Sequence, residues 1–146
     1  MLVLNLESNR DEYYSGLNGI SQDCDWNGWI AFFLQAITVQ ARANSARVRE
    51  IMDLYEAMKL ELHEVTRSQY SVYLLDAIFN KPIFKVTDVC KQLNLDYGIH
   101  EKTVADLLKQ LRNAGILKTI QSASGRRSAT VCFPSLLNVA EGKRVM

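Results

Sequence analysis

The sequence has few of the residues on which most enzyme sites depend. It contains only two histidines, His63 and His100, and three cysteines among its 146 residues. The motifs GxxxxGK(S/T), GxGxxG, HExxH and GxSxG, which mark common nucleotide-binding, metalloprotease and hydrolase sites, are all missing. Nothing in the chain assembles a nucleophile, a base and a group that orients the base. We therefore expect no catalytic residue, no metal site and no bound cofactor, and we expect that the chain is not an enzyme.

The cysteines and the apolar residues exclude two further classes. Cys24, Cys90 and Cys132 are far apart and form no CxxC pair, which indicates reduced, mostly buried thiols. No window reaches roughly 18 uncharged apolar residues, so no segment is expected to span a membrane. The first residues, MLVLNLESNRDE, lack the basic start and the apolar run of a signal peptide. We expect a cytoplasmic protein without a membrane partner.

Charge is divided unevenly along the chain. The net charge is +1, which by itself argues against strong binding to nucleic acid. Residues 1–65, however, hold 5 Lys or Arg against 10 Asp or Glu, a net charge of −5, whereas residues 66–146 hold 12 against 6, a net charge of +6. Such asymmetry indicates a basic binding module attached to a different segment.

The N-terminal half is predicted to consist of helices. Residues 9–20 favour a short helix with Asn9 as its N-cap, and residues 21–25 form a polar link. Residues 26–43 are predicted to form a buried helix, because large apolar side chains recur at spacings of three and four residues. Residues 45–65 are predicted to form a second long helix, whose heptad seam either joins two copies in a homodimer or packs on the helix at 26–43. The seam residues are Val48, Ile51, Tyr55, Met58, Leu62 and Val65.

After residue 66 the pattern changes to helix, helix, turn, helix, strand, turn, strand. That order is typical of a winged helix-turn-helix, with Gly115 closing the third helix in the left-handed conformation. We therefore predict a mainly α fold, with a helical segment over 1–65 and a winged helix-turn-helix domain over 66–146 whose wing is a small β-hairpin. The expected helices are 68–79, one capped by Thr87, 101–113 and one from Pro134; the expected extended segments are 83–85, 116–120 and 129–133. The expected inward side chains are Val72, Leu75, Ile78 and Phe79, then Val89, Cys90 and Leu93, then Val104, Leu107, Leu108 and Leu111.

The outward face of the helix at 101–113 is a candidate DNA-binding surface. In a helix-turn-helix the recognition helix lies in the major groove. Lys102, Lys109 and Arg112 can reach phosphates, and His100, Thr103 and Gln110 can contact base edges or phosphates. Glu101 and Asp106 oppose this reading, since each carboxylate repels a polyanion unless it accepts from a cytosine amino group. The alternative is an ordinary solvated face of mixed charge.

The segment SASGRRSATV is the second candidate. It places Arg126 and Arg127 directly after Gly125, between two expected strands, and residues 122–128 contain no acid. A hairpin tip of this composition suits contact with the DNA backbone. The alternative is a polar turn without a ligand, and winged helices also serve as protein-docking modules.

Two stretches of the chain resemble the C-terminal part of Fic-family proteins. One is LNLESNRDEYYSGLNGI followed by DWNGWIAFFLQAITVQA, and the other comprises PIFKVTDV and TVADLLKQLRNAGIL. The aromatic block is the more specific part, and the second part is generic for winged helices. In the aromatic block, the residues that match the Fic pattern are Asn9, Arg10, Tyr13, Tyr14, Asp25, Trp26, Trp29, Ile30, Phe32, Phe33 and Leu34. In the second part they are Pro82, Val86, Asp88, Val89, Thr103, Leu107, Leu108, Leu111, Gly115, Ile116 and Leu117.

The chain departs from Fic enzymes where their chemistry is located. Fic enzymes typically transfer AMP to a hydroxyl side chain with an HxFx(D/E)GNxR loop, and this loop is missing here. An extra loop at about 96–99 leaves the N-cap of the third helix open between Asp96 and His100. The resemblance therefore implies a non-catalytic protein. We expect a DNA-binding regulator, with a docking or regulatory subunit of a separately encoded Fic AMP-transferase as the alternative.

Overall fold

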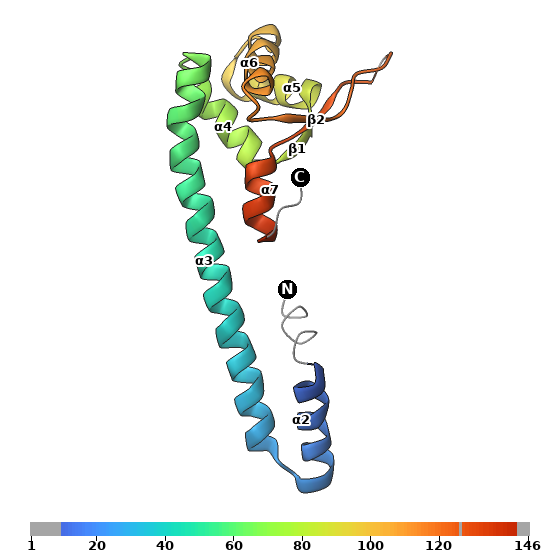
Figure 1. The fold of residues 1–146 in the computed structure, drawn as a ribbon. Coiled ribbons are helices and arrows are strands. Elements are labelled where there is room, and N and C mark those ends of the chain that lie inside the picture. Colours follow the sequence, from blue (N-terminus) through green and yellow to red (C-terminus); the bar gives the residue numbers. More distant parts are fainter. Residues whose placement is uncertain (1–9, 126, 143–146) are drawn as a thin grey trace. The chain divides into compact units, whose positions relative to one another are not determined.

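In the computed structural model, which describes residues 10–125 and 127–142, the chain is mainly helical and carries one small three-stranded antiparallel sheet (Figure 1). This agrees with the predicted mainly α class. The chain divides into two compact units, Met1–Val48 and Arg49–Met146. The division falls inside helix α3 (Trp26–Thr66), so no turn or linker marks it in the sequence.

The first unit is a helical hairpin made by α2 (Arg10–Asp23) and the start of α3. Tyr13 and Trp29 meet edge to face with 5.3 Å between their ring centroids. Gly16 allows this approach, because a Cβ there would lie 2.8 Å from a ring carbon of Trp29. Asp25 caps α3 by accepting the Gly28 N–H on Oδ1 at 2.9 Å.

The link between these helices is shorter than predicted, since only Cys24 and Asp25 separate them. Cys24 takes a φ of +54° at this turn and is exposed, so it is the exception among thiols that were predicted to be mostly buried. Cys90 and Cys132 are buried, and this desolvation raises the pKa of both thiols. The predicted N-cap, Asn9, lies outside the described residues.

The two helices predicted at 26–43 and 45–65 are one helix of 41 residues. No proline or glycine follows Gly28 before its end, and Asn44 and Ser45 alone do not stop a helix. A continuous helix cannot fold back, so the seam cannot pack on residues 26–43. It packs instead in the core of the second unit, except Val48, which is 55% exposed. The five seam residues in that core are Ile51, Tyr55, Met58, Leu62 and Val65.

The prediction that residues 26–43 form a buried helix is wrong. Trp26 and Leu34 are each 58% exposed, and Ile30 is 50% exposed. The reason is that α2 covers the side of α3 that carries Trp29. The part of this unit that the structure describes has no other element to cover the rest.

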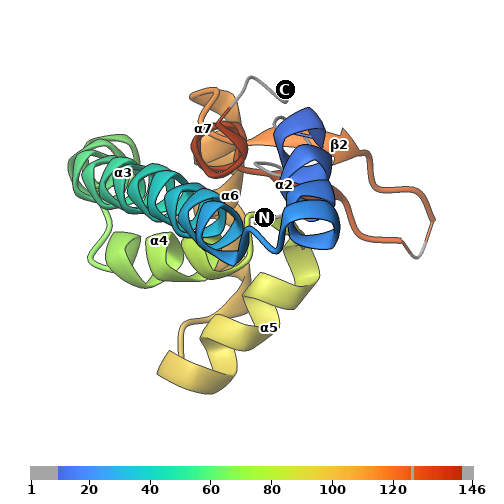
Figure 2. The same cartoon turned by 90° about the horizontal axis from the view of Figure 1, so that it is seen from below.

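The second unit builds its core around a small sheet in which β3 is central and antiparallel to both neighbours, in the order β1-β3-β2. Phe84 and Thr119 both pair with Val131, and the β2–β3 hairpin projects beyond the helices of the unit in both views (Figures 1 and 2). Beside the end of α3, the elements are α4 (Ser71–Asn80), β1 (Ile83–Lys85), α5 (Val86–Tyr97), α6 (Glu101–Asn113), β2 (Lys118–Gln121), β3 (Thr130–Cys132) and α7 (Pro134–Glu141).

Most of the inward side chains predicted for this unit are in its core. All seven predicted for α5 and α6 are buried, as are Leu75 and Ile78 of α4. Phe79 is partly buried against the core. The prediction that Val72 points inward is wrong, because its side chain is 43% exposed. Leu74 is buried instead.

Both ends of α5 differ from the prediction. The helix begins at Val86, so Thr87 is not its N-cap. Its first N–H groups bond instead to the segment just before β3: the Val86 N–H donates to the Ala129 carbonyl at 3.1 Å, and the Thr87 N–H donates to Ser128 Oγ at 3.3 Å. Its last turn includes Asp96 and Tyr97, the first half of the predicted extra loop, and Gly98 caps the helix with a φ of +68°.

The structure answers the open question of the α6 N-cap and agrees with the glycine predicted at its other end. His100 is its N-cap, since its Nδ1 accepts the Lys102 N–H at 3.2 Å, whereas Asp96 lies inside α5. Gly115 follows the last turn with φ of +80°, as predicted.

Because an L side chain is strained at this φ, Gly115→Ala is expected to lower the free energy of unfolding by about 1–2 kcal/mol. Gly115→Asn should cost less, and equal losses in urea unfolding would contradict this origin of the effect.

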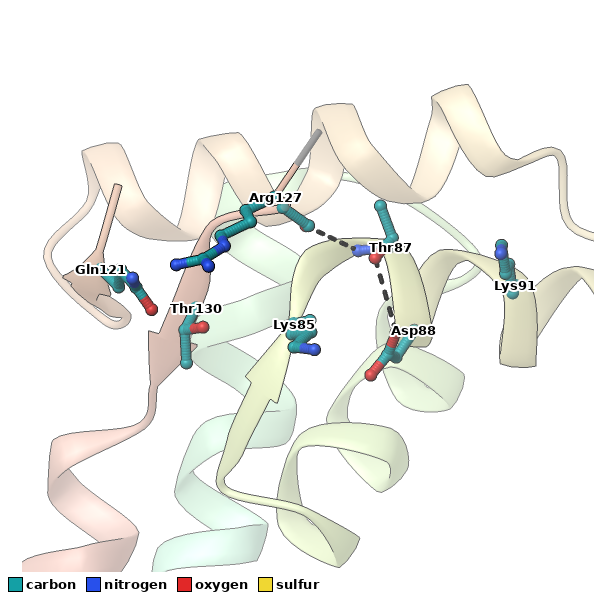
Figure 3. A pocket seen from close by; sticks show the side chains of 8 residues that line it. Lys85, Thr87, Asp88, Lys91, Gln121, Arg127 and Thr130 are labelled. Carbon is teal, nitrogen blue, oxygen red and sulfur yellow. Dashed lines mark hydrogen bonds between the residues drawn. The ribbon is translucent and has the colours of Figure 1, made fainter. Parts of the chain in front are cut away.

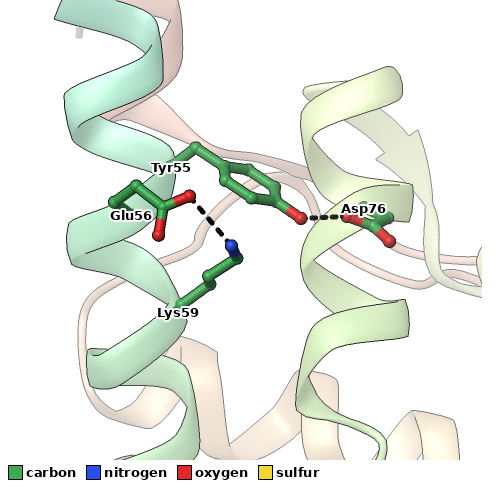
Figure 4. Close-up of polar contacts among 4 residues, drawn as sticks. All are labelled: Tyr55, Glu56, Lys59 and Asp76. Carbon is green, nitrogen blue, oxygen red and sulfur yellow. Dashed lines mark hydrogen bonds and ion pairs between the residues drawn. The ribbon is translucent and has the colours of Figure 1, made fainter.

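Tyr55 of α3 donates its hydroxyl proton to Asp76 Oδ1 of α4 at 2.5 Å (Figure 4). This bond, with burial, raises the pKa of Tyr55 to about 12. The pKa of tyrosine in the unfolded chain is about 10, which is lower than this value. The bond therefore contributes its full stabilisation below pH 10, and that contribution is lost as the pH rises to 12.

Tyr55→Phe is expected to lower the free energy of unfolding by about 1 kcal/mol at pH 7, because it removes this bond. The difference should shrink above pH 10 in urea unfolding, and a constant difference would refute the assignment.

Candidate nucleic-acid interface

A polar hollow of about 560 Å³ lies between the β2–β3 hairpin and the start of α5 (Figure 3). β1 and α5 contribute one side of it, and the hairpin contributes the other. The lining residues are Lys85, Thr87, Asp88, Lys91, Gln121, Arg127, Ser128 and Thr130.

Backbone pairing brings the two sides of the hollow together. Lys85 pairs with Thr130 across β1 and β3, which places the end of β1 beside the base of the hairpin. The bond from the Thr87 N–H to Ser128 Oγ ties α5 to the same strand segment. Further out, Ser124 and Arg127 exchange both backbone hydrogen bonds, at 3.1 and 2.9 Å. The position of Arg127 at the hollow is therefore set by strand pairing.

The hollow carries an excess of positive charge. Lys85, Lys91 and Arg127 face a single acid, Asp88. Among the described residues, the only ion pair joins Lys59 to Glu56, so these three cations are not neutralised by a carboxylate within 4 Å. The N-terminal end of α5 adds a partial positive charge. An anion with several oxygen acceptors matches this arrangement chemically.

The DNA-binding residues predicted on α6 do not line this hollow. Lys102, Lys109 and Gln110 are exposed on the helix, whereas Thr103 is half-buried. Arg112 is also half-buried, and its Nε is buried without a hydrogen-bond partner in the described part of the chain. The structure therefore separates the predicted residues into an exposed α6 face and the hollow, which contains Arg127. Arg126 lies outside the described residues.

Sequence reasoning missed Lys85 and Lys91 as candidate ligands. The sequence signal that could have indicated them is one lysine directly before a helix and a second lysine near the second turn of that helix. Their partner across the hollow, Arg127, is more than 35 residues away in the sequence. Only the pairing of β1 with β3 brings them to one site.

In residues 10–125 and 127–142, no group of three or more His, Cys, Asp or Glu side chains is placed to hold a metal ion. No helix in those same ranges is long and apolar enough to cross a membrane. Compared with models of known protein families, the chain matches none.

Proposed function

We propose that residues 66–140 form a winged helix-turn-helix that binds duplex DNA as a regulator, with α6 as the recognition helix and the β2–β3 hairpin as the wing. The order of α4, α5, α6, β2 and β3 supports this reading, as does the antiparallel sheet that β1 completes. The observation that carries the proposal is the hollow with three cations unpaired among the described residues at the base of the hairpin. These cations would hold backbone phosphates, which fix register without reading sequence.

The side chains favour duplex over single-stranded DNA. Proteins that bind single strands generally stack bases on aromatic rings. Neither the hollow nor α6 contains an aromatic residue. The exposed Lys102, Lys109 and Gln110 instead offer the charged and amide groups that contact phosphates and base edges in a groove.

Fluorescence anisotropy tests this function with labelled random-sequence duplex and single-stranded DNA of equal length over a salt series. Duplex binding is expected to be tighter, and log K should fall with log salt at a slope of about −0.9 for each phosphate contacted. No binding at low salt, or binding that is independent of salt, would reject the proposed function. A preference for the single strand would reject the choice of duplex.

The exposed apolar face of the first unit favours a second candidate function, docking to a separately encoded Fic catalytic chain. Trp26, Ile30 and Leu34 are at least half exposed, and residues 26–41 contain no charged side chain. These three also belong to the block that resembles Fic proteins. The test is size-exclusion chromatography with a chain that carries the HxFx(D/E)GNxR loop and is encoded beside this one. A one-to-one complex that Leu34→Asp abolishes is expected, and separate elution would reject this candidate.

A further inference from the structure

A second, smaller hollow of about 230 Å³ lies between α4 and α5 in the second unit. Two tyrosines form its aromatic part: the rings of Tyr73 and Tyr97 lie 4.4 Å apart between centroids and are tilted by 37°. Both remain accessible, with Tyr73 39% and Tyr97 52% exposed. Asp76, Asn80 and Gln92 add a carboxylate and two amides to the lining.

The carboxylate in this hollow is held in place. Asp76 accepts the Tyr55 hydroxyl proton on Oδ1, while its second oxygen points away from Tyr55 (Figure 4). Among the described residues, Asp76 has no ion pair, and no lysine or arginine lines the hollow. The Asp76 carboxylate therefore has a fixed orientation and shares the hollow with two accessible aromatic rings, but it has no cationic partner among the described residues.

We propose that this α4–α5 hollow binds an arginine side chain of another protein. A guanidinium stacks on tyrosine faces and donates to carboxylate and amide oxygens in the same plane, whereas a lysine ammonium is a strongly hydrated point charge. Another protein is the better source than a second copy of this chain. An arginine of one copy in the hollow of the next makes a head-to-tail contact, which forms open chains unless the rotation closes.

The probe for this site is N-acetyl-arginine amide, added to the 15N-labelled full chain and followed by amide chemical shifts. Shifts are expected at Tyr73, Asp76 and Tyr97, with weaker binding of the lysine analogue. The citrulline analogue has nearly the same shape without the charge and should cause no comparable shifts. Equal binding of citrulline and arginine, or shifts located elsewhere, would overturn the proposal.

Variants separate this chemistry from general effects on the fold. Asp76→Asn keeps an oxygen for the Tyr55 hydroxyl but removes the charge, and Tyr97→Ala removes one ring; each should weaken arginine binding about two- to fivefold. Leu95→Ala is the control, since Leu95 is 83% exposed on the same helix and does not line the hollow. Unchanged binding by Asp76→Asn would overturn the proposal.

Sedimentation velocity tests the source of the arginine. The wild type is expected to show no self-association that depends on Asp76. Self-association that Asp76→Asn abolishes would assign the hollow to a second copy of the chain and overturn the proposal of another protein.

Discussion

Replacing Lys85, Lys91 and Arg127 together by alanine is expected to weaken duplex DNA binding on the order of 1,000-fold at low salt, because each charge-assisted bond to a phosphate contributes about 1.5 kcal/mol and every 1.4 kcal/mol or so is tenfold in affinity. All three side chains line the hollow, and none has an ion-pair partner among the described residues. Each lost phosphate contact also removes one released counterion. The slope of log K against log salt should therefore become shallower by roughly 2.7.

A charge-matched variant is the control for this experiment. Arg42→Ala/Arg47→Ala/Arg49→Ala removes the same three positive charges from α3, outside the hollow. It is expected to keep most of the wild-type affinity and nearly the wild-type slope. An equal loss in both variants would trace the effect to net charge. A hollow variant with the wild-type slope would show that these cations do not contact phosphates.

Leu111→Ala is expected to lower the free energy of unfolding of the second unit by about 2–5 kcal/mol. Leu111 is fully buried on the inner face of α6, and it belongs to the core that includes Leu62, Leu74 and Phe133. Alanine removes this apolar volume and leaves a cavity that neighbouring side chains fill only in part. Since whole domains are stable by about 5–15 kcal/mol, this loss is a large fraction of the total.

The measurement must report on the second unit alone. Trp26 and Trp29 are both in the first unit, so tryptophan fluorescence does not follow the loss of Leu111. Hydrogen exchange of the amides in α4, α5 and α6 follows the stability of the second unit directly. Leu95→Ala is the matched control: it deletes the same atoms from a side chain that is 83% exposed, and should change stability by less than about 0.5 kcal/mol. A loss below 1 kcal/mol for Leu111→Ala would contradict the cavity argument.

The inner and outer faces of α6 follow from local spacing. Val104, Leu107, Leu108 and Leu111 repeat with the helical period, and all four are buried. Once that face is fixed, Lys102 and Lys109 must be exposed, as they are. Gly115 at +80° likewise follows from the rule that glycine ends helices in the left-handed conformation.

The charged hollow could not be predicted in this way. Lys85 and Arg127 share it because β1 pairs with β3, and such a long-range pairing leaves no periodic trace near either residue. The prediction of where α5 begins was wrong for the same reason. Its first donors bond to Ala129 and Ser128 from the hairpin, so the local capping residue, Thr87, is not needed for that role.

The sequence by itself determined the order of the helices and strands that follow α3 and which of their faces are apolar, because both depend on neighbours a few residues apart. The tertiary structure alone decided which apolar faces are covered. The stretch from Trp26 to Ile37 has the apolar spacing of a buried helix, yet α2 covers only the side that carries Trp29. Five of its other large side chains are 37–58% exposed: Trp26, Ile30, Phe33, Leu34 and Ile37. Apolar spacing gives a helix a face that favours burial. Burial itself requires a second surface, and the positions of surfaces depend on contacts between distant parts of the chain.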